Sequence, residues 1–387
     1  MEISARRYDN LEPVRIRIEG TRIAEVTPLQ PDGSLNELPI VAPAFYDLQI
    51  NGHGGIWFGQ PDLTPEKVLS VLKPHYSFGV TRMFPTLITN SNENLLHGFQ
   101  QIRKACEQEK WADQLVTGCH LEGPYLSGED GPRGAHPKEH IRPANWDEFQ
   151  NWQEASGGRL RLVTIAPETE GAIDFIRRAV EAGVVISIGH TAAEPDDIHR
   201  AVDAGATMST HLGNGAHGTI RRHPNYIWEQ LAHDDLTAGL ITDGHHLPAS
   251  VVKCMVRVKG TENCIITCDA SGLSGCPPGL YHGSELDVEV LEDGRVVVAG
   301  QRQYLAGSGA STLDCVRWAA QIPEIGLRAA CDMAGNQVAS HFSDEEIRLE
   351  AGSRADFICL AMGEPDGTIR LTSTIAQGEI CYGEIIS

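Results

Sequence analysis

The sequence predicts an α/β protein: a TIM-like (β/α)8 barrel with a small β-sandwich domain formed from both termini. Apolar runs of strand length alternate with helical stretches through the middle of the chain, whereas both ends contain short alternating strands. Several of the central runs also stop at a residue that can bind a metal or transfer a proton. In a parallel barrel all strand carboxyl ends open onto one face, where active sites are built.

The central strands are short apolar runs rich in β-branched residues. The eight candidates are Ala44–Ile50, Val80–Pro85, Leu115–Leu121, Leu160–Ala166, Val184–Gly189, Thr207–His211, Thr237–Thr242 and Cys264–Cys268. Helices are expected between them, for example from Thr64 as N-cap with Pro65 at the first helical position. Glu170–Ala182, Pro195–Ala204 and Pro248–Lys259 are further helical stretches. An open doubly wound sheet is the alternative, but sites spread over strands 1, 3, 5, 6 and 8 favour a closed ring.

The two ends of the chain have the alternation of half-buried strands. The candidate strands there are Val14–Ile18, Arg22–Val26, Ala355–Leu360, Gly367–Leu371 and Thr374–Ile386. We therefore expect residues 1–43 and 350–387 to form one small β domain. Residues 44–349 are expected to form the catalytic barrel.

The composition narrows the function classes. The 387 residues include 31 basic and 52 acidic side chains, a formal charge of −21. Such a surface repels nucleic acid and anionic membranes, so neither is expected as a partner, and a small-molecule substrate is favoured. No signal peptide or apolar span of membrane length is visible, and the ten cysteines show no disulfide-type spacing. We expect a cytoplasmic protein with reduced thiols.

A candidate metal site comes from three strand ends. Glu122, His190 and His211 each close a predicted strand. Two histidines and one glutamate form a zinc-type ligand set that leaves a position for water. One divalent ion is expected, with zinc as the first choice and iron, cobalt or manganese also compatible with these ligands.

Asp269, directly after the eighth strand, is the candidate general acid and base. An ordinary loop or helix-capping carboxylate is the alternative interpretation. His246, after the seventh strand, is a candidate donor to the substrate carbonyl, although His245 beside it leaves the assignment open. His136, in the long loop after Glu122, is either a substrate contact or a solvated loop histidine.

The first strand ends differently from that of two-metal barrel hydrolases, which often carry His-x-His there. This chain has Gln49-x-Asn51, two poor zinc ligands that hydrogen-bond well, and we assign both to the substrate site. Their presence favours one metal. His53 leaves a second metal site open.

A set of motifs, in this order and spacing, resembles the amidohydrolase superfamily and within it the N-acetylglucosamine-6-phosphate deacetylases. The resemblance runs nearly end to end. The matching segments are Asp47-Leu-Gln-Ile-Asn-Gly-His-Gly-Gly55, His120-Leu-Glu-Gly-Pro124, Gly134-Ala-His136, Gly189-His-Thr191, Thr210-His-Leu-Gly-Asn214, Asp243-Gly-His-His246, Asp269-Ala270, Leu305-Ala-Gly-Ser308 and Leu349–Phe357.

The resemblance implies deacetylation of N-acetylglucosamine 6-phosphate to glucosamine 6-phosphate and acetate, by the metal set and acid/base named above. It places substrate contacts at His136, Asn214, Gly215 and His246. It also implies a homodimer in which Arg221 or Arg222 of the neighbouring subunit contacts the phosphate.

The chain departs from the family pattern where Gly213-Asn-Gly-Ala-His-Gly-Thr219 precedes the arginine pair. Because this segment shapes the sugar and phosphate pocket, the departure affects the substrate more than the reaction. A solvated arginine pair is the alternative interpretation of Arg221 and Arg222. An amidohydrolase acting on another N-acyl or cyclic amide compound is the rival function, and a non-catalytic barrel scaffold is the second rival.

Overall fold

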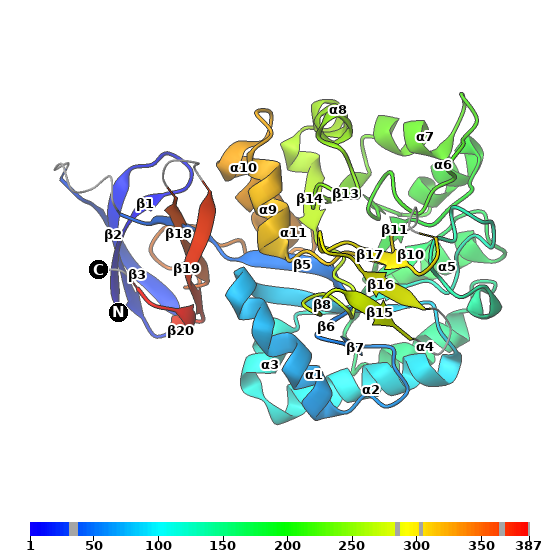
Figure 1. The fold of residues 1–387 in the computed structure, drawn as a ribbon, viewed down its shortest axis with the longest axis horizontal. Coiled ribbons are helices and arrows are strands. Elements are labelled where there is room, and N and C mark those ends of the chain that lie inside the picture. Colours follow the sequence, from blue (N-terminus) through cyan, green and yellow to red (C-terminus); the bar gives the residue numbers. More distant parts are fainter. Residues whose placement is uncertain (31–37, 283–286, 302–304, 364–367, 386–387) are drawn as a thin grey trace.

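The protein is a parallel barrel with a small sheet domain at its side (Figure 1). The computed structural model describes residues 1–30, 38–282, 287–301, 305–363 and 368–385. Eight strands pair in the order β14-β13-β12-β11-β10-β9-β8-β5, and every neighbouring pair is parallel. A parallel bridge from Ile50 to Ala270 brings the two edges of this sheet together. The predicted closed ring is therefore confirmed.

The barrel strands fall where the apolar runs predicted them. They are β5 (Phe45–Ile50), β8 (Val80–Ile88), β9 (Cys119–Glu122), β10 (Leu160–Ile165), β11 (Val185–Ile188), β12 (Met208–Ser209), β13 (Thr237–Ile241) and β14 (Cys264–Thr267). The largest error is at the third strand, which was predicted from Leu115. Leu115 is instead the last residue of helix α3 (Lys110–Leu115). Its apolar side chain is buried in the core, as a strand residue would be, but it reaches the core from this helix.

Helices follow most of the strands and surround the ring (Figure 1). Thr64 caps the first of them by accepting a hydrogen bond from Lys67 N, as its sequence predicted. The longer helices are α1 (Pro65–Leu72), α2 (Asn92–Gln108), α4 (Trp146–Ala155), α5 (Ala172–Glu181), α6 (Pro195–Asp203), α7 (Tyr226–Ala232), α8 (Ala249–Lys259), α9 (Thr312–Ala320) and α10 (Gly326–Met333). Short α11 (Asn336–His341) contacts β5 and β14.

Both ends of the chain contribute to the second, seven-stranded sheet, so the predicted small domain is confirmed. Its order is β20 (Glu379–Gly383), β19 (Ile369–Ala376), β18 (Phe357–Met362), β4 (Ile40–Pro43), β1 (Glu2–Arg7), β2 (Pro13–Glu19) and β3 (Arg22–Pro28). The boundaries at residues 43 and 350 stay predictions.

The predicted last strand, Thr374–Ile386, is wrong in its extent. A turn at Gln377 and Gly378, both with positive φ, divides it between β19 and β20. Glycine favours such a turn because it adopts positive φ without a steric penalty. Gly367 and Ile386, which bounded predicted strands, lie outside the described residues.

Sequence reasoning missed a three-stranded antiparallel sheet after the eighth barrel strand. It consists of β15 (Gly279–Tyr281), β16 (Val288–Val290) and β17 (Val296–Val298). The sequence does contain a signal for a hairpin here. An Asp293-Gly294 turn separates the alternating valines of β16 from the valine run of β17. Two short strands, β6 (Gly52–His53) and β7 (Ile56–Trp57), form a hairpin after β5. Trp57 of this hairpin and Tyr281 of β15 each pack against the apolar cluster formed by the valines of β16 and β17.

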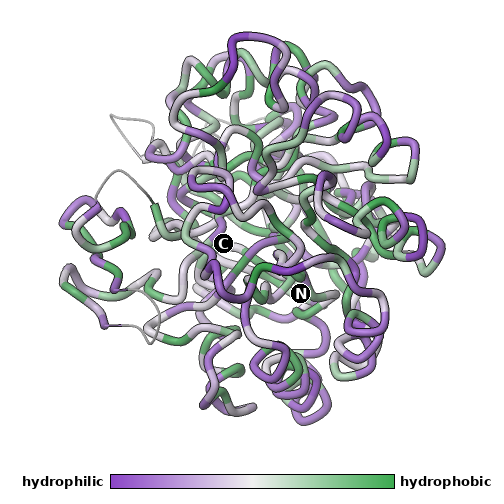
Figure 2. The backbone as a smooth tube through the Cα atoms, turned by 90° about the vertical axis from the view of Figure 1, so that its right-hand side faces the viewer, coloured by the Kyte–Doolittle hydropathy of each residue, from purple (hydrophilic) through white to green (hydrophobic). Residues whose placement is uncertain are grey.

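The core lies between the barrel strands and the helices around them. Hydrophobic residues gather along the strands in the interior, while the surrounding helices alternate between hydrophobic and hydrophilic residues (Figure 2). A separate apolar cluster, which includes Ile16 and Phe357, fills the small domain. All ten cysteines are free. None of the helices among the described residues is long and apolar enough to cross a membrane.

Candidate active site

The predicted site residues stand at the carboxyl ends of the barrel strands. Glu122 is the last residue of β9, whereas His190, His211 and Asp269 each lie two residues beyond the end of a strand. These three have φ of 51°, 27° and 51°, in the left-handed region that residues with a side chain seldom adopt. Such conformations persist only where the surrounding structure enforces them, and they concentrate at functional sites.

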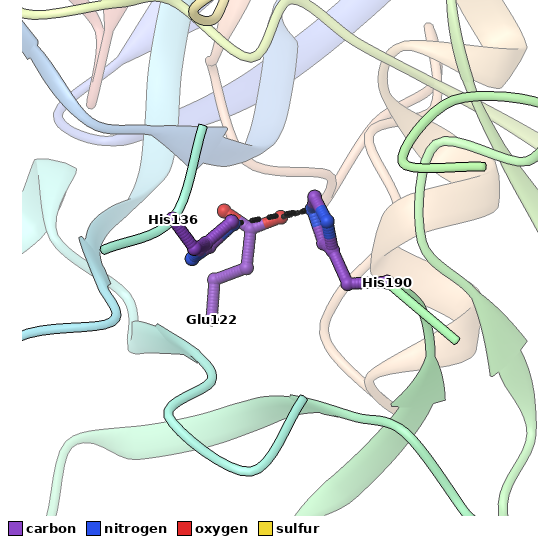
Figure 3. A group of neighbouring side chains, drawn as sticks. All are labelled: Glu122, His136 and His190. Carbon is purple, nitrogen blue, oxygen red and sulfur yellow. Dashed lines mark hydrogen bonds and ion pairs between the residues drawn. The ribbon is translucent and has the colours of Figure 1, made fainter. Parts of the chain in front are cut away.

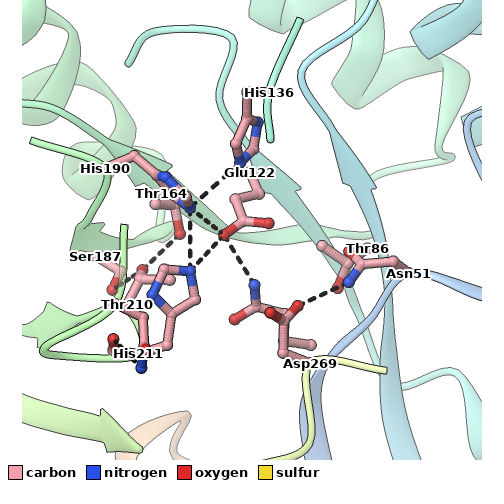
Figure 4. Close-up of polar contacts among 12 residues, drawn as sticks. Asn51, Thr86, Glu122, His136, Thr164, Ser187, His190, Thr210, His211 and Asp269 are labelled. Carbon is pink, nitrogen blue, oxygen red and sulfur yellow. Dashed lines mark hydrogen bonds and ion pairs between the residues drawn. The ribbon is translucent and has the colours of Figure 1, made fainter. Parts of the chain in front are cut away.

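The three predicted metal ligands converge (Figure 4). Glu122 Oε1 lies 3.2 Å from His190 Nε2 and 3.0 Å from His211 Nε2, and the two Nε2 atoms are 3.1 Å apart. All three side chains are buried. Residues up to 89 positions apart in the chain are thus brought together by strand order alone.

The chemistry of this set fits a divalent cation. His190 Nδ1 lies 2.8 Å from the carbonyl oxygen of Pro132, which can only accept a hydrogen bond. Nδ1 therefore carries the proton, and in the neutral ring Nε2 presents a lone pair toward the Glu122 carboxylate. A lone pair and a buried anion repel one another unless a positive charge lies between them. The carbonyl partner of His190 is also the kind of contact that orients metal-binding histidines.

His136 joins the same cluster (Figure 3). Its Nε2 lies 3.2 Å from His190 Nε2, while its Nδ1 lies 2.8 Å from the hydroxyl of Thr89. Burial, followed by the neighbouring His190, lowers the pKa of His136 to about 3, so its ring is neutral. The sequence placed this residue among the substrate contacts. Its position makes it a candidate for either a substrate contact or a fourth ligand.

Gln49 and Asn51 hold the two carboxylates of the site. Gln49 Nε2 donates to Glu122 Oε1 at 2.8 Å, and Asn51 Nδ2 donates to Asp269 Oδ1 at 2.7 Å. Asn51 also lines the cavity, whereas Gln49 is buried and does not line it. The amide nitrogen of Gln49 thus positions Glu122, and its predicted substrate contact stays a prediction.

The surroundings of Asp269 move its pKa toward neutral pH. Burial, followed by the charge of the Glu122 carboxylate, raises its pKa to about 7, and the hydrogen bond from Asn51 opposes this rise. A carboxyl group that titrates near neutral pH can both take up and release a proton during turnover.

The substrate contacts expected after the sixth and seventh strands line one cavity of about 1170 Å³ together with the cluster. They are Asn214, Gly215 and His246. Asn214 Nδ2 donates to the carbonyl oxygen of His211 at 3.2 Å. A Cβ atom at Gly215 would lie 2.7 Å from His190 Nδ1, so only glycine permits this close approach. The missed sheet contributes Tyr281 and Val288 to the cavity wall.

Arg221 and Arg222 lie away from this cavity in their own chain. Both are exposed, and Arg221 Nη1 is 3.6 Å from Glu194 Oε2 in a surface ion pair. Neither is among the residues that line the cavity. A phosphate contact from these arginines would therefore have to come from another subunit, as the resemblance implies, and it stays a prediction.

His53 does not join the ligand cluster. Its ring packs edge-on against His75 and Phe78, and it is absent from the residues that line the cavity. Within the described residues, the group of potential metal ligands consists of Glu122, His136 and His190, to which His211 is added by the distances above. The structure provides no support for a second site at His53.

No protein-family profile matches the chain. Solved structures share its fold, among them a 5-methylcytosine deaminase from Klebsiella pneumoniae (13% identity, TM-score 0.62, 100% of this chain and 98% of the other). An enamidase described as a member of the amidohydrolase superfamily is similar at TM-score 0.59, with 14% identity over 99% of this chain and 94% of the other. At 13% and 14% identity these neighbours show a shared fold, the parallel barrel with its second sheet.

More similar proteins define the family. The chain is 30% identical to an N-acetylgalactosamine-6-phosphate deacetylase of Shewanella sp. (strain ANA-3), over 94% of its own length and 89% of the relative. It is 32% identical to an N-acetylglucosamine-6-phosphate deacetylase of Bos taurus, over 89% and 83%. A Mycobacterium smegmatis N-acetyl-D-glucosamine-6-phosphate deacetylase, solved with N-acetyl-D-glucosamine-6-phosphate, has TM-score 0.86 and 28% identity over 98% and 99%. The chain belongs to this family of amino-sugar-6-phosphate deacetylases and is a hydrolase.

Proposed function

We propose that this enzyme hydrolyses the N-acetyl group of N-acetylglucosamine 6-phosphate, forming glucosamine 6-phosphate and acetate. The observation that carries the proposal is the buried convergence of Glu122, His190 and His211 in one cavity with Asp269, in a chain of the deacetylase family.

We assign the metal to Glu122, His190 and His211. When bound there, a divalent ion supplies Lewis acidity toward the amide carbonyl and toward water. Zinc is our first choice because two histidines and one carboxylate form a common catalytic zinc set. His136 and Asn51 face the same cavity and orient the substrate beside this set.

Asp269 moves the proton of the reaction. In its ionised form it takes a proton from the attacking water as the new bond to the carbonyl carbon forms. It then gives this proton to the nitrogen as the C–N bond breaks, so that the amine leaves in neutral form. His246 donates a hydrogen bond to the carbonyl oxygen as negative charge develops there.

N-acetylgalactosamine 6-phosphate is the second candidate substrate, because the relative from Shewanella carries that activity in its name. The two sugars differ only in the orientation of the hydroxyl at C4. We keep a homodimer, with Arg221 or Arg222 reaching the partner's cavity, as part of the proposal. The cytoplasmic location also stays a prediction.

The test is acetate release from a panel of four compounds: the two N-acetylated sugars, each with and without the 6-phosphate. We expect the highest kcat/KM with N-acetylglucosamine 6-phosphate. A higher kcat/KM with the galactosamine compound would change the proposed substrate and leave the proposed reaction unchanged. Absence of acetate from all four compounds, with metal bound, would reject the proposal.

A further inference from the structure

Asp243 occupies the same structural position as three of the site residues. It lies two residues beyond the end of β13, as His190, His211 and Asp269 lie two residues beyond β11, β12 and β14. Its side chain is only 2% exposed. An aspartate at this position among the strand ends points to a role in the site that the proposed mechanism has not yet used.

The Asp243 carboxylate receives four hydrogen bonds. Oδ1 accepts from the backbone N–H groups of His245 and His246, at 2.8 and 2.9 Å. Oδ2 is 2.7 Å from His246 Nδ1 and accepts from the hydroxyl of Ser308 at 2.9 Å. Burial alone would raise the pKa of Asp243, but its hydrogen bonds with the His246 ring and these backbone groups hold it well below its usual range.

These contacts determine the proton position on His246. An ionised carboxylate has no proton to donate, so the ring must carry its proton on Nδ1. This leaves Nε2 as the ring nitrogen that is not engaged by Asp243, in a side chain that lines the cavity. To donate to a carbonyl from Nε2 while Nδ1 donates to Asp243, the ring must carry a proton on both nitrogens.

Ser308 links this pair to the acid/base residue. Its hydroxyl donates to Asp243 Oδ2, while its backbone N–H donates to the carbonyl oxygen of Asp269 at 2.8 Å. The segment around Ser308 runs parallel to the chain after β14, through a bridge between Ala270 and Ser308. The motif Leu305-Ala-Gly-Ser308 thus contacts both sides of the reaction centre.

We propose that Asp243 is a positioning residue that holds His246 with Nδ1 protonated and Nε2 directed toward the substrate, and that Ser308 sets this pair relative to Asp269. The inference rests on the proposed function for its catalytic consequence, but the proton position on His246 can be measured without substrate.

The alternative is that Asp243 only stabilises its turn through the two backbone N–H groups, a common use of aspartate. Asp243→Asn separates the two roles. The asparagine oxygen can still accept from the backbone, while its NH2 group replaces Oδ2 and faces the His246 ring and Ser308. Ser274→Ala is a matched control for Ser308→Ala, because Ser274 Oγ donates to Gly309 O in the same region.

The first experiment is a double-mutant cycle with acetate release as the readout. We expect Asp243→Asn and His246→Asn each to lower kcat by about 100-fold. His246→Asn removes the donor, whereas Asp243→Asn removes the carboxylate that fixes the ring and balances the positive charge of a ring that donates with Nδ1 also protonated. If Asp243 acts through His246, the double variant should be within about threefold of His246→Asn. A further loss of about 100-fold in the double variant would show independent action and overturn the proposal.

The second experiment is ¹⁵N NMR of the histidine rings, with His246→Asn used to assign the signal. We expect Nδ1 of His246 to be protonated in the wild-type protein and the proton to move to Nε2 in Asp243→Asn. Ser308→Ala should change the signal, and Ser274→Ala should not. A wild-type ring protonated only on Nε2 would overturn the proposal, even if Asp243→Asn fails to fold. Failure of the proposed function would give a different result. The wild-type enzyme would release no acetate, while its His246 ring would still be protonated on Nδ1.

Discussion

The buried end of the barrel and the exposed loop that follows β12 are built in different ways. Glu122, His190 and His211 are at most 7% exposed and are held by strand ends. Arg221 and Arg222 belong to a loop, are exposed and do not line the cavity of their own chain. We assign the first region to the reaction and the second to substrate choice.

This difference indicates where the protein tolerates changes of sequence. Buried polar groups must keep their partners, because leaving one unsatisfied costs about 1–3 kcal/mol. An exposed arginine exchanges its ion pair for water at little cost. The departure of residues 213–219 from the family pattern can therefore alter the substrate while the reaction centre stays intact. The four predictions below test this division.

The largest effect is expected from Asp269→Asn. The variant keeps the hydrogen-bonding shape of the side chain but cannot accept a proton from water, so kcat should fall by about 10²–10⁴-fold. Metal content, measured by elemental analysis, should not change. A variant that keeps more than about a tenth of wild-type kcat would remove Asp269 from the acid/base role.

The next prediction separates metal ligands from substrate contacts. His211→Ala should lose the metal, whereas His136→Ala should keep it and lose activity mainly through KM, because we assign only His211 to the ligand set. Elemental analysis of the purified variants decides this, with one equivalent expected in the wild-type subunit. Loss of metal from His136→Ala would make His136 a fourth ligand. Two equivalents in the wild-type protein, with one lost in His53→Ala, would contradict the single-metal site.

The third prediction concerns pH. As a base Asp269 acts only when ionised, and its pKa is raised to about 7, so kcat/KM should be low in acid and rise through about pH 7. Asn51→Ala removes a hydrogen bond that favours the charged form, so the midpoint should move up by about one pH unit.

Gln49→Ala is the control for this shift, because Gln49 donates to the other carboxylate. It should weaken metal binding by about 10–100-fold and leave the pH midpoint in place once metal is saturating. Equal midpoints in wild type and Asn51→Ala would mean that another group controls the rise.

The smallest effect is expected in the exposed loop. Arg222→Ala should raise KM for the 6-phosphate by up to about tenfold, the loss of one charge-assisted hydrogen bond, and leave KM for the unphosphorylated sugar unchanged. Arg221→Ala is the control, because Arg221 pairs with Glu194 on the surface. If both substitutions affect both sugars equally, the two arginines do not bind the phosphate. The substrate should then be sought among neutral N-acyl compounds.

Much of the fold could be predicted because its signals are local. Short runs of β-branched residues mark the strands, and caps such as Thr64 mark the helices, since neighbouring residues determine these backbone conformations. The candidate site residues stand out because each ends or follows such a run, and a parallel barrel places all these positions on one face. The sequence by itself therefore determined the barrel and the candidates Glu122, His190, His211 and Asp269.

Only the tertiary structure decided which partners these side chains meet. Gln49 donates to Glu122, 73 residues later in the chain, and the proton position on His190 depends on the Pro132 carbonyl, 58 residues earlier. Asp243 and Ser308 gained a role in the same way, through a contact 65 residues apart. Hydrogen bonds act over about 3 Å between atoms whose separation along the chain carries no signal, so the closed ring of strands is needed to define them.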